Sequence, residues 1–348
     1  GSHIDFSSFT HFAQTAERGL FDFLFLAEGL RLREQNGQIY DLDVVGRPDT
    51  FTILAAVTEH LGLAGTINST FNEPVEVARQ FATLDHLSDG RAAWNVVTSW
   101  DAFTGENFRR GGYLAADQRY VRAREFLETA VELWGSWEND DVIADRSSGE
   151  FLRRPQAGRF ARVDSQFDVS GTFPVPRSPQ GCPVIFQAGD SDEGREFAAA
   201  RADAIFSRHS TLDEGRTFYT DVKRRLAAYG RSPDDLLILP AATFVVGDTD
   251  EDAAHLAHQI RLAQVSGQTA IKFLEQLWNR DLSNHDPDGP LPTVDPLPGE
   301  NTIAKGRASV RIREDPRDVA ARWRALAESK NLSTRELIIE VTGRQSFF

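Results

Sequence analysis

Residues 183–198 read PVIFQAGDSDEGREFA, and this stretch carries most of the information in the sequence. Its first four residues form a short apolar run, as expected for a strand that is covered on both faces. Gly189 lets the backbone turn sharply, and Ser191 is a good N-cap for a helix with an acidic first turn. The stretch therefore predicts a buried strand, a tight turn and a helix. The start of such a helix can hold a phosphate, but an ordinary capped turn is the simpler interpretation of this pattern alone.

Strands and helices alternate along most of the chain. Apolar runs predict strands at residues 21–27, 63–70, 92–98, 183–188, 204–207 and 236–246. Helical spacing and capping residues predict helices at residues 9–18, 50–60, 74–90, 116–134, 192–201, 214–229, 250–264, 317–329 and 335–341. Such alternation is typical of parallel βαβ units. The alternation fits a doubly wound sheet or a (βα)8 barrel. The sequence has no GxGxxG motif after a strand, and this absence makes a dinucleotide-binding doubly wound sheet the weaker interpretation.

Two segments interrupt the alternation. Residues 138–182 are polar and contain Pro and Gly, with a weak hairpin pattern around residues 160–169. A second insertion spans about residues 265–315, and its part 281–301 must be a loop because prolines and glycines recur there. Residues 30–47 are also polar, and we expect them to be irregular.

The composition indicates which partners are excluded and in which cellular compartment we expect the protein. The 348 residues carry a net charge of −14, which argues against nucleic acid or an anionic membrane as partner. No apolar run approaches the roughly 20 residues that a membrane helix needs. The single cysteine, Cys182, excludes an internal disulfide, so we expect a reducing cytoplasm.

Motifs for hydrolytic and metal-dependent chemistry are absent from the sequence. It has no HExxH or GxSxG motif, and no catalytic motif surrounds Cys182. His255 and His258 share a helix face without a matching carboxylate pattern, so a solvated face is the simpler interpretation and we expect no metal site. The residues alone assign no catalytic group.

Polar residues follow several predicted strands at their carboxyl ends, as at Glu28, Ser99 and Gln187. In a barrel and in a doubly wound sheet alike, the functional site lies at this edge. Trp94 lies within a strand and is expected in the core. Trp100 lies beyond the strand end, where a flat ring can wall a pocket for a planar ligand.

Longer segments carry a resemblance to a known family. They include AAVTEHLGLAGTINSTFNEP (55–74), ATLDHLSDGRAAWNVVTSW (82–100), DQRY (117–120) and SPQGCPVIFQAGDSDEGREFAA (178–199). These segments resemble the flavin-dependent two-component monooxygenases that include nitrilotriacetate monooxygenase component A, dibenzothiophene-sulfone monooxygenase and the pristinamycin IIA synthase subunit. That family is part of the bacterial-luciferase-like superfamily, and the resemblance covers nearly the whole chain.

The resemblance implies a (βα)8 TIM barrel of the bacterial-luciferase-like type that binds reduced FMN at the carboxyl ends of its strands. The positions that match the family would place six residues around the flavin, namely Glu28, Thr66, Ser99, Trp100, Tyr120 and Ser191. Tyr120 and Ser191 would hold the phosphate, although Tyr120 is otherwise an ordinary residue of an amphipathic helix. Glu28 stands where the family has an aspartate.

The implied activity is that of a two-component monooxygenase. A separate NAD(P)H-dependent flavin reductase would supply FMNH2, and one atom of O2 would enter a small organic substrate such as an amino-polycarboxylate or a sulfone. Asn68, Asn72 and Arg109 are candidate substrate contacts, although a solvated loop is the simpler interpretation of the arginine. Two other functions stay open: a deazaflavin-dependent oxidoreductase and a flavin-binding protein without catalysis.

We expect residues 1–348 to form a single barrel domain with insertions at about 138–182 and 265–315. Compared with the family, the first and last barrel segments are missing from this sequence. It also holds no methionine, even after the tag-like Gly1-Ser2-His3. We therefore expect that methionines of the native chain are left out of this sequence. For the terminal barrel segments two alternatives stay open: the sequence omits them, or the chain is a damaged relative of the family. The resemblance also suggests a homodimer or a homotetramer.

Overall fold

The computed structural model describes residues 5–30, 33–35, 38–41, 54–99, 107–108, 114, 116–209, 211–297, 304–305 and 315–341. The chain divides into two compact units. Unit 1 comprises residues 1–30 and 44–240, and unit 2 comprises residues 31–43 and 241–348. The assembly of both units into a single barrel domain stays a prediction.

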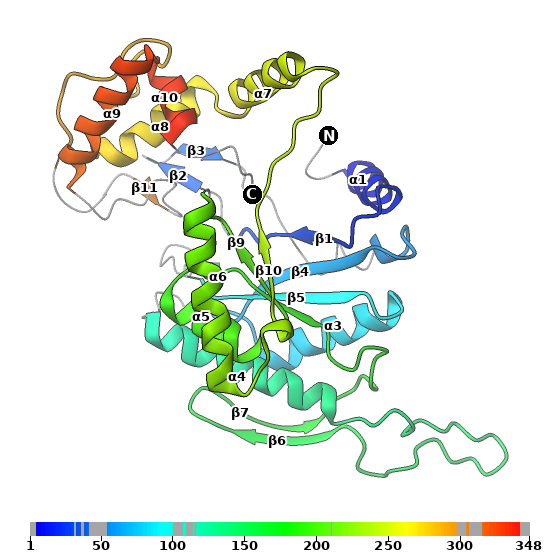
Figure 1. The fold of residues 1–348 in the computed structure, drawn as a ribbon. Coiled ribbons are helices and arrows are strands. Elements are labelled where there is room, and N and C mark those ends of the chain that lie inside the picture. The colour runs from blue at the N-terminus through cyan, green and yellow to red at the C-terminus, as the bar shows by residue number, and fades with distance from the viewer. Residues whose placement is uncertain are drawn as a thin grey trace. The chain divides into compact units, whose positions relative to one another are not determined.

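Unit 1 is built on one curled parallel sheet (Figure 1). Its six strands, in spatial order, are β1 (Phe23–Leu26), β4 (Gly62–Asn68), β5 (Ala92–Val97), β8 (Val184–Gln187), β9 (Ala204–Ser207) and β10 (Leu237–Pro240). Every neighbouring pair is parallel. A doubly wound sheet reverses its strand order part-way, whereas this order follows the chain without reversal. The sheet therefore has the arrangement of the predicted barrel.

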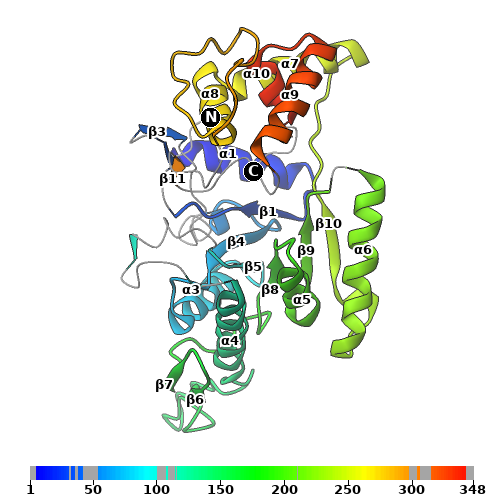
Figure 2. The same ribbon diagram turned by 90° about the vertical axis from the view of Figure 1, so that its left-hand side faces the viewer.

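Helices cover one face of this sheet. They are α1 (Phe6–Arg18), α3 (Pro74–Leu87), α4 (Ala116–Gly135), α5 (Asp192–Arg201) and α6 (Leu212–Leu226). Figure 2 shows α3, α4, α5 and α6 following one another around the sheet. Local signals predicted these helices correctly, since Gly19 ends α1 and Pro74 occupies the first turn of α3. The predicted end of the 214–229 helix is a separate 3₁₀ turn, η2 (Ala227–Tyr229).

Trp94 of β5 lies in the core between the sheet and its helices. Its side chain is fully buried, and its Nε1 donates to the carbonyl of Ile67 at 3.0 Å. Its ring lies 5.6 Å from that of Phe81 in α3 and 5.7 Å from that of Phe126 in α4. Truncating such a buried aromatic side chain costs about 3–5 kcal/mol. The predicted core position of Trp94 is confirmed.

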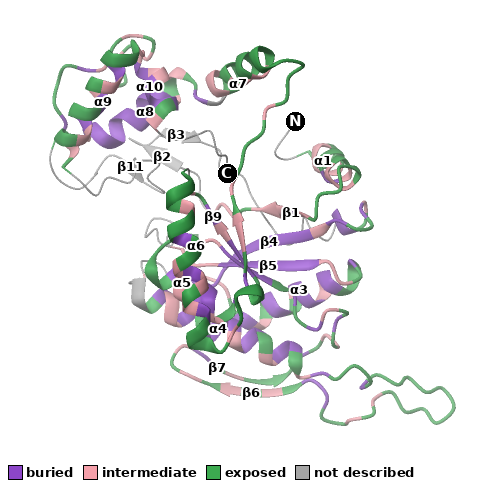
Figure 3. Ribbon diagram, in the orientation of Figure 1, coloured by how far each residue is buried: buried purple, intermediate pink, exposed green. Residues whose placement is uncertain are grey.

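The opposite, inner face of the sheet has a smaller core of its own. Ala64, Ala93 and Phe186 are buried there on β4, β5 and β8. Figure 3 shows β4 and β5 buried along almost their whole length, as expected for parallel strands covered on both faces. Side chains alternate between the faces of a strand, so Thr66 and Asn95 share the inner face with Ala64 and Ala93.

The insertion at 138–182 forms an appendage of unit 1 (Figure 1). It contains the antiparallel hairpin of β6 (Arg159–Val163) and β7 (Asp168–Thr172), which confirms the hairpin predicted there. An ion pair fixes the preceding loop, because Arg154 binds the fully buried Asp141 at 2.5 Å. Hydrogen bonds from Arg154 hold the pKa of Asp141 down at about 2.

Unit 2 is mainly helical. Its helices are α7 (Asp250–Gln264), α8 (Gly267–Trp278), α9 (Pro316–Lys330) and α10 (Thr334–Val341). A small sheet in the order β11 (Ala304–Lys305), β2 (Arg33–Gln35) and β3 (Gln38–Asp41) belongs to the same unit. The core of this unit is formed by α8, α9 and α10, with Leu274, Trp278, Trp323 and Leu337 among its side chains.

Four predictions of secondary structure are wrong. Within the described residues, the helix predicted at 50–60 is helical only at 54–55, and residues 56–60 form turns and bends. The apolar run 236–246 forms a strand only to Pro240, and Phe244 and Val246 beyond it are largely exposed. Residues 30–47, predicted to be irregular, contain the short strands β2 and β3. Helix α8 lies inside the second insertion and was not predicted. Residues 270–278 of α8 are all buried, including the polar side chains of Lys272, Glu275 and Gln276. The apolar residues recur at helical spacing, at positions 270, 271, 273, 274, 277 and 278, so the sequence did carry a signal for this helix.

Candidate functional site

Thr66 and Asn95 form a buried polar pair on the inner face of the sheet. Thr66 Oγ1 donates to the carbonyl of Leu26 at 2.7 Å and accepts from Asn95 Nδ2 at 3.0 Å. Both side chains are almost completely buried. Among the described residues, none donates a hydrogen bond to Asn95 Oδ1. Because a buried acceptor without a donor is costly, this oxygen is a candidate contact for a ligand.

Asn95 was not among the predicted site residues. The sequence gives one signal for it, because an asparagine interrupts the apolar strand AAWNVV. Buried amides are usually hydrogen-bonded, so a polar side chain in such a strand points to a network or to a ligand. That signal does not distinguish a hydrogen-bond network from a contact with a ligand.

Glu28 lies just beyond the end of β1, next to the end of β4. Its Oε2 accepts hydrogen bonds from the backbone N of Asn68 at 3.0 Å and from Asn68 Nδ2 at 3.1 Å. Burial raises the pKa of Glu28 to about 7, although both hydrogen bonds from Asn68 act in the opposite direction. The Glu28 carboxyl group can therefore hold or release a proton near neutral pH.

Asn68 and Asn72 shape the turn between β4 and α3. Asn68 Oδ1 accepts from the backbone N of Phe71 at 2.8 Å, and Asn72 Nδ2 donates to the carbonyl of Asn68 at 2.8 Å. Arg122 Nη2 of α4 donates to the carbonyl of Asn72 at 2.8 Å. These contacts position the turn at the carboxyl edge of the sheet, whereas substrate binding by Asn68 and Asn72 stays a prediction.

Ser99 lies at the same edge, beyond β5. Its backbone N donates to Thr70 Oγ1 at 3.0 Å, and its carbonyl accepts from Arg119 Nη1 of α4 at 3.0 Å. The backbone of Ser99 is thus held between the β4 turn and α4. Trp100 and Arg109, also predicted to belong to the site, lie outside the described residues.

Ser191 and Tyr120 come together at the start of α5. Ser191 is the N-cap of this helix, and its Oγ accepts from the backbone N of Gly194 at 3.1 Å. The predicted capped turn is therefore confirmed. Ser191 Oγ also lies 3.4 Å from the hydroxyl of Tyr120, which α4 supplies. Two hydroxyl groups and the free N–H groups of a helix start form a surface suited to an anion.

Gly189 leaves room for these hydroxyl groups. A Cβ atom at this position would lie 2.8 Å from the Tyr120 hydroxyl and 3.0 Å from Cα of Gly194. A Cβ atom at Gly194 would in turn lie 2.9 Å from Cα of Gly189. Both glycines are therefore needed because strand β8 and helix α5 approach each other closely.

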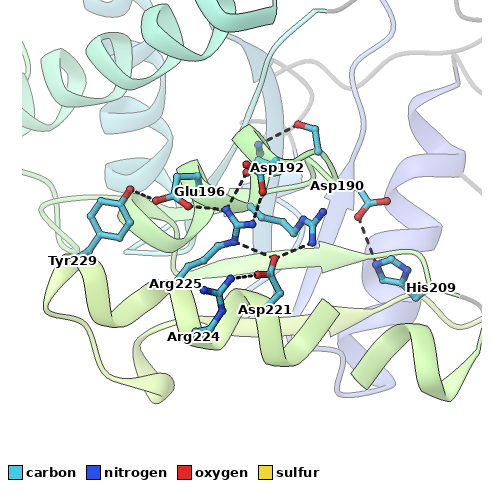
Figure 4. Close-up of polar contacts among 11 residues, drawn as sticks. Asp190, Asp192, Glu196, His209, Asp221, Arg224, Arg225 and Tyr229 are labelled. Carbon is cyan, nitrogen blue, oxygen red and sulfur yellow. Dashed lines mark hydrogen bonds and ion pairs between the residues drawn. The ribbon is translucent and has the colours of Figure 1, made fainter. Parts of the chain in front are cut away.

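Charged side chains surround the start of α5 (Figure 4). Arg225 of α6 binds the Asp192 carboxylate, Glu196 Oε2 at 2.7 Å and Asp221 Oδ2 at 3.0 Å. Burial lowers the pKa of Arg225, but its bonds to these three acids outweigh burial and raise it above the ordinary value. At the other side of Ser191, Asp190 lies 3.5 Å from His209 Nε2.

Comparison with known proteins identifies the family. A family model described as luciferase-like monooxygenase matches residues 1–329. The chain is 37% identical to nitrilotriacetate monooxygenase component A of Aminobacter aminovorans over 350 residues, which cover 97% of this chain and 74% of that protein. The chain therefore belongs to the luciferase-like family of flavin-dependent monooxygenases, and the resemblance seen in its sequence is confirmed.

Solved structures agree with this assignment. The structure of DmoA from Hyphomicrobium sulfonivorans matches with a TM-score of 0.74 and 31% identity, covering 97% of this chain and 70% of DmoA. Riboflavin lyase (RcaE), solved with modified FMN and riboflavin, matches with a TM-score of 0.73 and 30% identity, covering 82% of this chain and 66% of the lyase. The predicted luciferase-like barrel fold is thus confirmed. In the described part of the chain, every helix is too short or too polar to cross a membrane.

Proposed function

We propose that this chain is the oxygenating component of a two-component monooxygenase. It takes FMNH2 from a separate NAD(P)H-dependent reductase and inserts one atom of O2 into a small organic substrate, such as an amino-polycarboxylate or a sulfone. The other oxygen atom would leave as water, and FMNH2 would be oxidised to FMN. The observation that carries this proposal is the Ser191–Tyr120 hydroxyl pair at the start of α5. A separate reductase is consistent with the name of one relative, nitrilotriacetate monooxygenase component A, because that name implies an enzyme with more than one component.

The residues at the start of α5 fit a flavin phosphate. Ser191 and Tyr120 offer hydroxyl groups, and the helix start offers backbone N–H groups with positive partial charge. A side chain at Gly189 would occupy the space beside Tyr120, so glycine keeps this space open. The phosphate would be held at this end of the site.

The inner face of the sheet fits the flavin ring. Asn95 Oδ1 is an acceptor without a donor among the described residues, so it would accept a hydrogen bond from a ring N–H. Thr66 holds the Asn95 amide in place from the other side. Ser99 and Trp100 would line the ring at the end of β5.

When bound, reduced FMN supplies the activation of O2, and the protein supplies binding, orientation and exclusion of water. Asn68 holds one oxygen of Glu28, so the carboxyl group keeps a fixed orientation in both protonation states. With a pKa of about 7, Glu28 can hold a proton at this edge or release it. Asn68, Asn72 and Arg109 are the proposed substrate contacts.

The test is an oxygen-uptake assay with FMNH2 supplied by a generic flavin reductase and a panel of amino-polycarboxylates and sulfones. The expected product is heavier than its substrate by one oxygen atom. Failure of the whole panel to give an oxygenated product, while FMNH2 is being supplied, would contradict the proposal. Turnover with a reduced deazaflavin instead of FMNH2 would identify the oxidoreductase alternative. Tight binding of oxidised FMN without turnover would identify a non-catalytic flavin-binding protein.

Two further properties belong to the same proposal. The chain would act in the cytoplasm, where a reductase can regenerate the reduced flavin, and it would form a homodimer or a homotetramer. Light scattering coupled to size-exclusion chromatography measures the second property, and a monomer at micromolar concentration would contradict it.

A further inference from the structure

The start of α5 poses an electrostatic problem for a phosphate ligand. Ser191 is flanked in the chain by Asp190 and Asp192, whose side chains are both more than half exposed. Acidic residues in the first turn stabilise a helix through its dipole, but they also repel a second anion at the same place. A dianionic phosphate at Ser191 therefore requires that this negative charge be offset.

Arg225 is placed to offset the charge of Asp192. It reaches from α6 to α5, where Nη2 binds the Asp192 carboxylate and Nη1 lies 3.4 Å from the Asp192 carbonyl. The same Nη1 binds Glu196, one turn further along α5, at 2.7 Å. Arg225 thus offsets the negative charge of Asp192 and also binds the backbone of the first turn of α5.

The guanidinium group is itself fixed in this position. Asp221, four residues before Arg225 on α6, accepts from Arg225 Nε at 3.0 Å. On the other side, Glu196 accepts from the Tyr229 hydroxyl at 2.5 Å. Only 14% of the Arg225 side chain is exposed, so solvent screens its charge less than that of a surface arginine. Figure 4 shows the carboxylates of Asp192, Glu196 and Asp221 converging on this one guanidinium group.

We propose that Arg225 is a positioning residue for the phosphate of the flavin. It neutralises Asp192 and fixes the turn that carries Ser191, without touching the ligand. This inference rests on the proposed function, because it assumes that Ser191 and Tyr120 hold a phosphate. Riboflavin lacks that phosphate, so Arg225 matters for FMN and not for riboflavin.

The experiment compares the dissociation constants of FMN and riboflavin, measured by flavin fluorescence and repeated under nitrogen with dithionite-reduced flavins. Arg225→Gln is expected to weaken FMN binding by about threefold to tenfold, and riboflavin binding by less than about twofold. Arg225→Lys keeps the charge and should lose less FMN affinity than Arg225→Gln. In Arg225→Gln/Asp192→Asn, where the repelling charge is also gone, FMN affinity should return to within about twofold of the original value.

Arg224→Gln is the matched control. It removes an arginine of the same helix that pairs with Asp221 and is largely exposed, and it should leave the ratio of the FMN and riboflavin constants unchanged. Equal weakening of both ligands by Arg225→Gln, or no recovery in the double variant, would overturn the inference. If Ser191→Ala/Tyr120→Phe still lowers FMN affinity selectively in that case, the phosphate site stands and only the role of Arg225 is wrong. If the original protein binds FMN and riboflavin equally well, the phosphate site itself is wrong.

Discussion

The two ends of the proposed flavin site are built in different ways. At the inner face of the sheet, buried neutral groups such as Thr66 and Asn95 are held by short hydrogen bonds. At the start of α5, the exposed Ser191 lies among charged side chains of α5 and α6. A lost contact leaves a buried polar group unpaired at the first end, whereas solvent replaces it at the second. Substitutions should therefore have larger effects at the sheet than at the helix.

The largest effect is expected for Asn95→Leu. This change removes the proposed acceptor for the flavin ring and leaves Thr66 without its donor. Flavin affinity should fall by about 30-fold to 100-fold for FMN and riboflavin alike, because both share the ring. Flavin fluorescence titration measures the two constants, and urea unfolding measures an expected stability loss of about 1–3 kcal/mol. A loss confined to FMN would show that Asn95 serves the phosphate rather than the ring.

The second prediction concerns Glu28 and pH. The folded state keeps the Glu28 proton up to a pKa of about 7, whereas the unfolded chain releases it near the ordinary value of 4.5. The contribution of Glu28 to the free energy of unfolding is therefore complete below pH 4.5 and is lost as the pH rises through 7. This contribution is at most about 3 kcal/mol.

Urea unfolding between pH 5 and pH 8 tests this dependence. Glu28→Gln keeps a similar shape without titrating, so its stability should change less across this range than that of the original protein. Glu132→Gln serves as a control, because Glu132 is an acid of α4 that pairs with Arg162 and is not one of the proposed flavin contacts. Equal slopes for the original protein and Glu28→Gln would contradict the raised pKa.

The third prediction tests the helix end. Ser191→Ala/Tyr120→Phe removes both hydroxyl groups, and FMN affinity should fall by about tenfold while riboflavin affinity stays within about twofold. Loss of the serine cap should also cost about 1 kcal/mol of stability, because the backbone N of Gly194 loses its acceptor. Thermal unfolding followed by circular dichroism measures that cost, and Tyr120→Phe alone separates it from the ligand effect. Unchanged FMN affinity in the double variant would refute the phosphate assignment.

The same contrast explains which parts of the site the sequence could predict. The turn at Ser191 is encoded locally, by a cap, an acidic first turn and a glycine within a few residues. The contact between Glu28 and Asn68 joins residues 40 positions apart, so no local pattern contains it. Whether a donor lies near Asn95 Oδ1 depends on which strands are neighbours in the sheet. The apolar runs alone do not determine that order. The family resemblance supplied Glu28, Thr66 and Tyr120, but it did not supply their contacts.

The smallest effect is expected for Asp190→Asn. Removing this carboxylate beside Ser191 should tighten FMN binding by about twofold, because one repelling charge near the phosphate is gone. The gain should disappear at 1 M salt, where exposed charges are screened within about 3 Å. Asp213→Asn is the matched control, since Asp213 is an exposed acid of the first turn of α6. If Asp190→Asn instead weakens FMN binding, the contact of Asp190 with His209 orders the turn, and packing rather than charge decides affinity at the helix end.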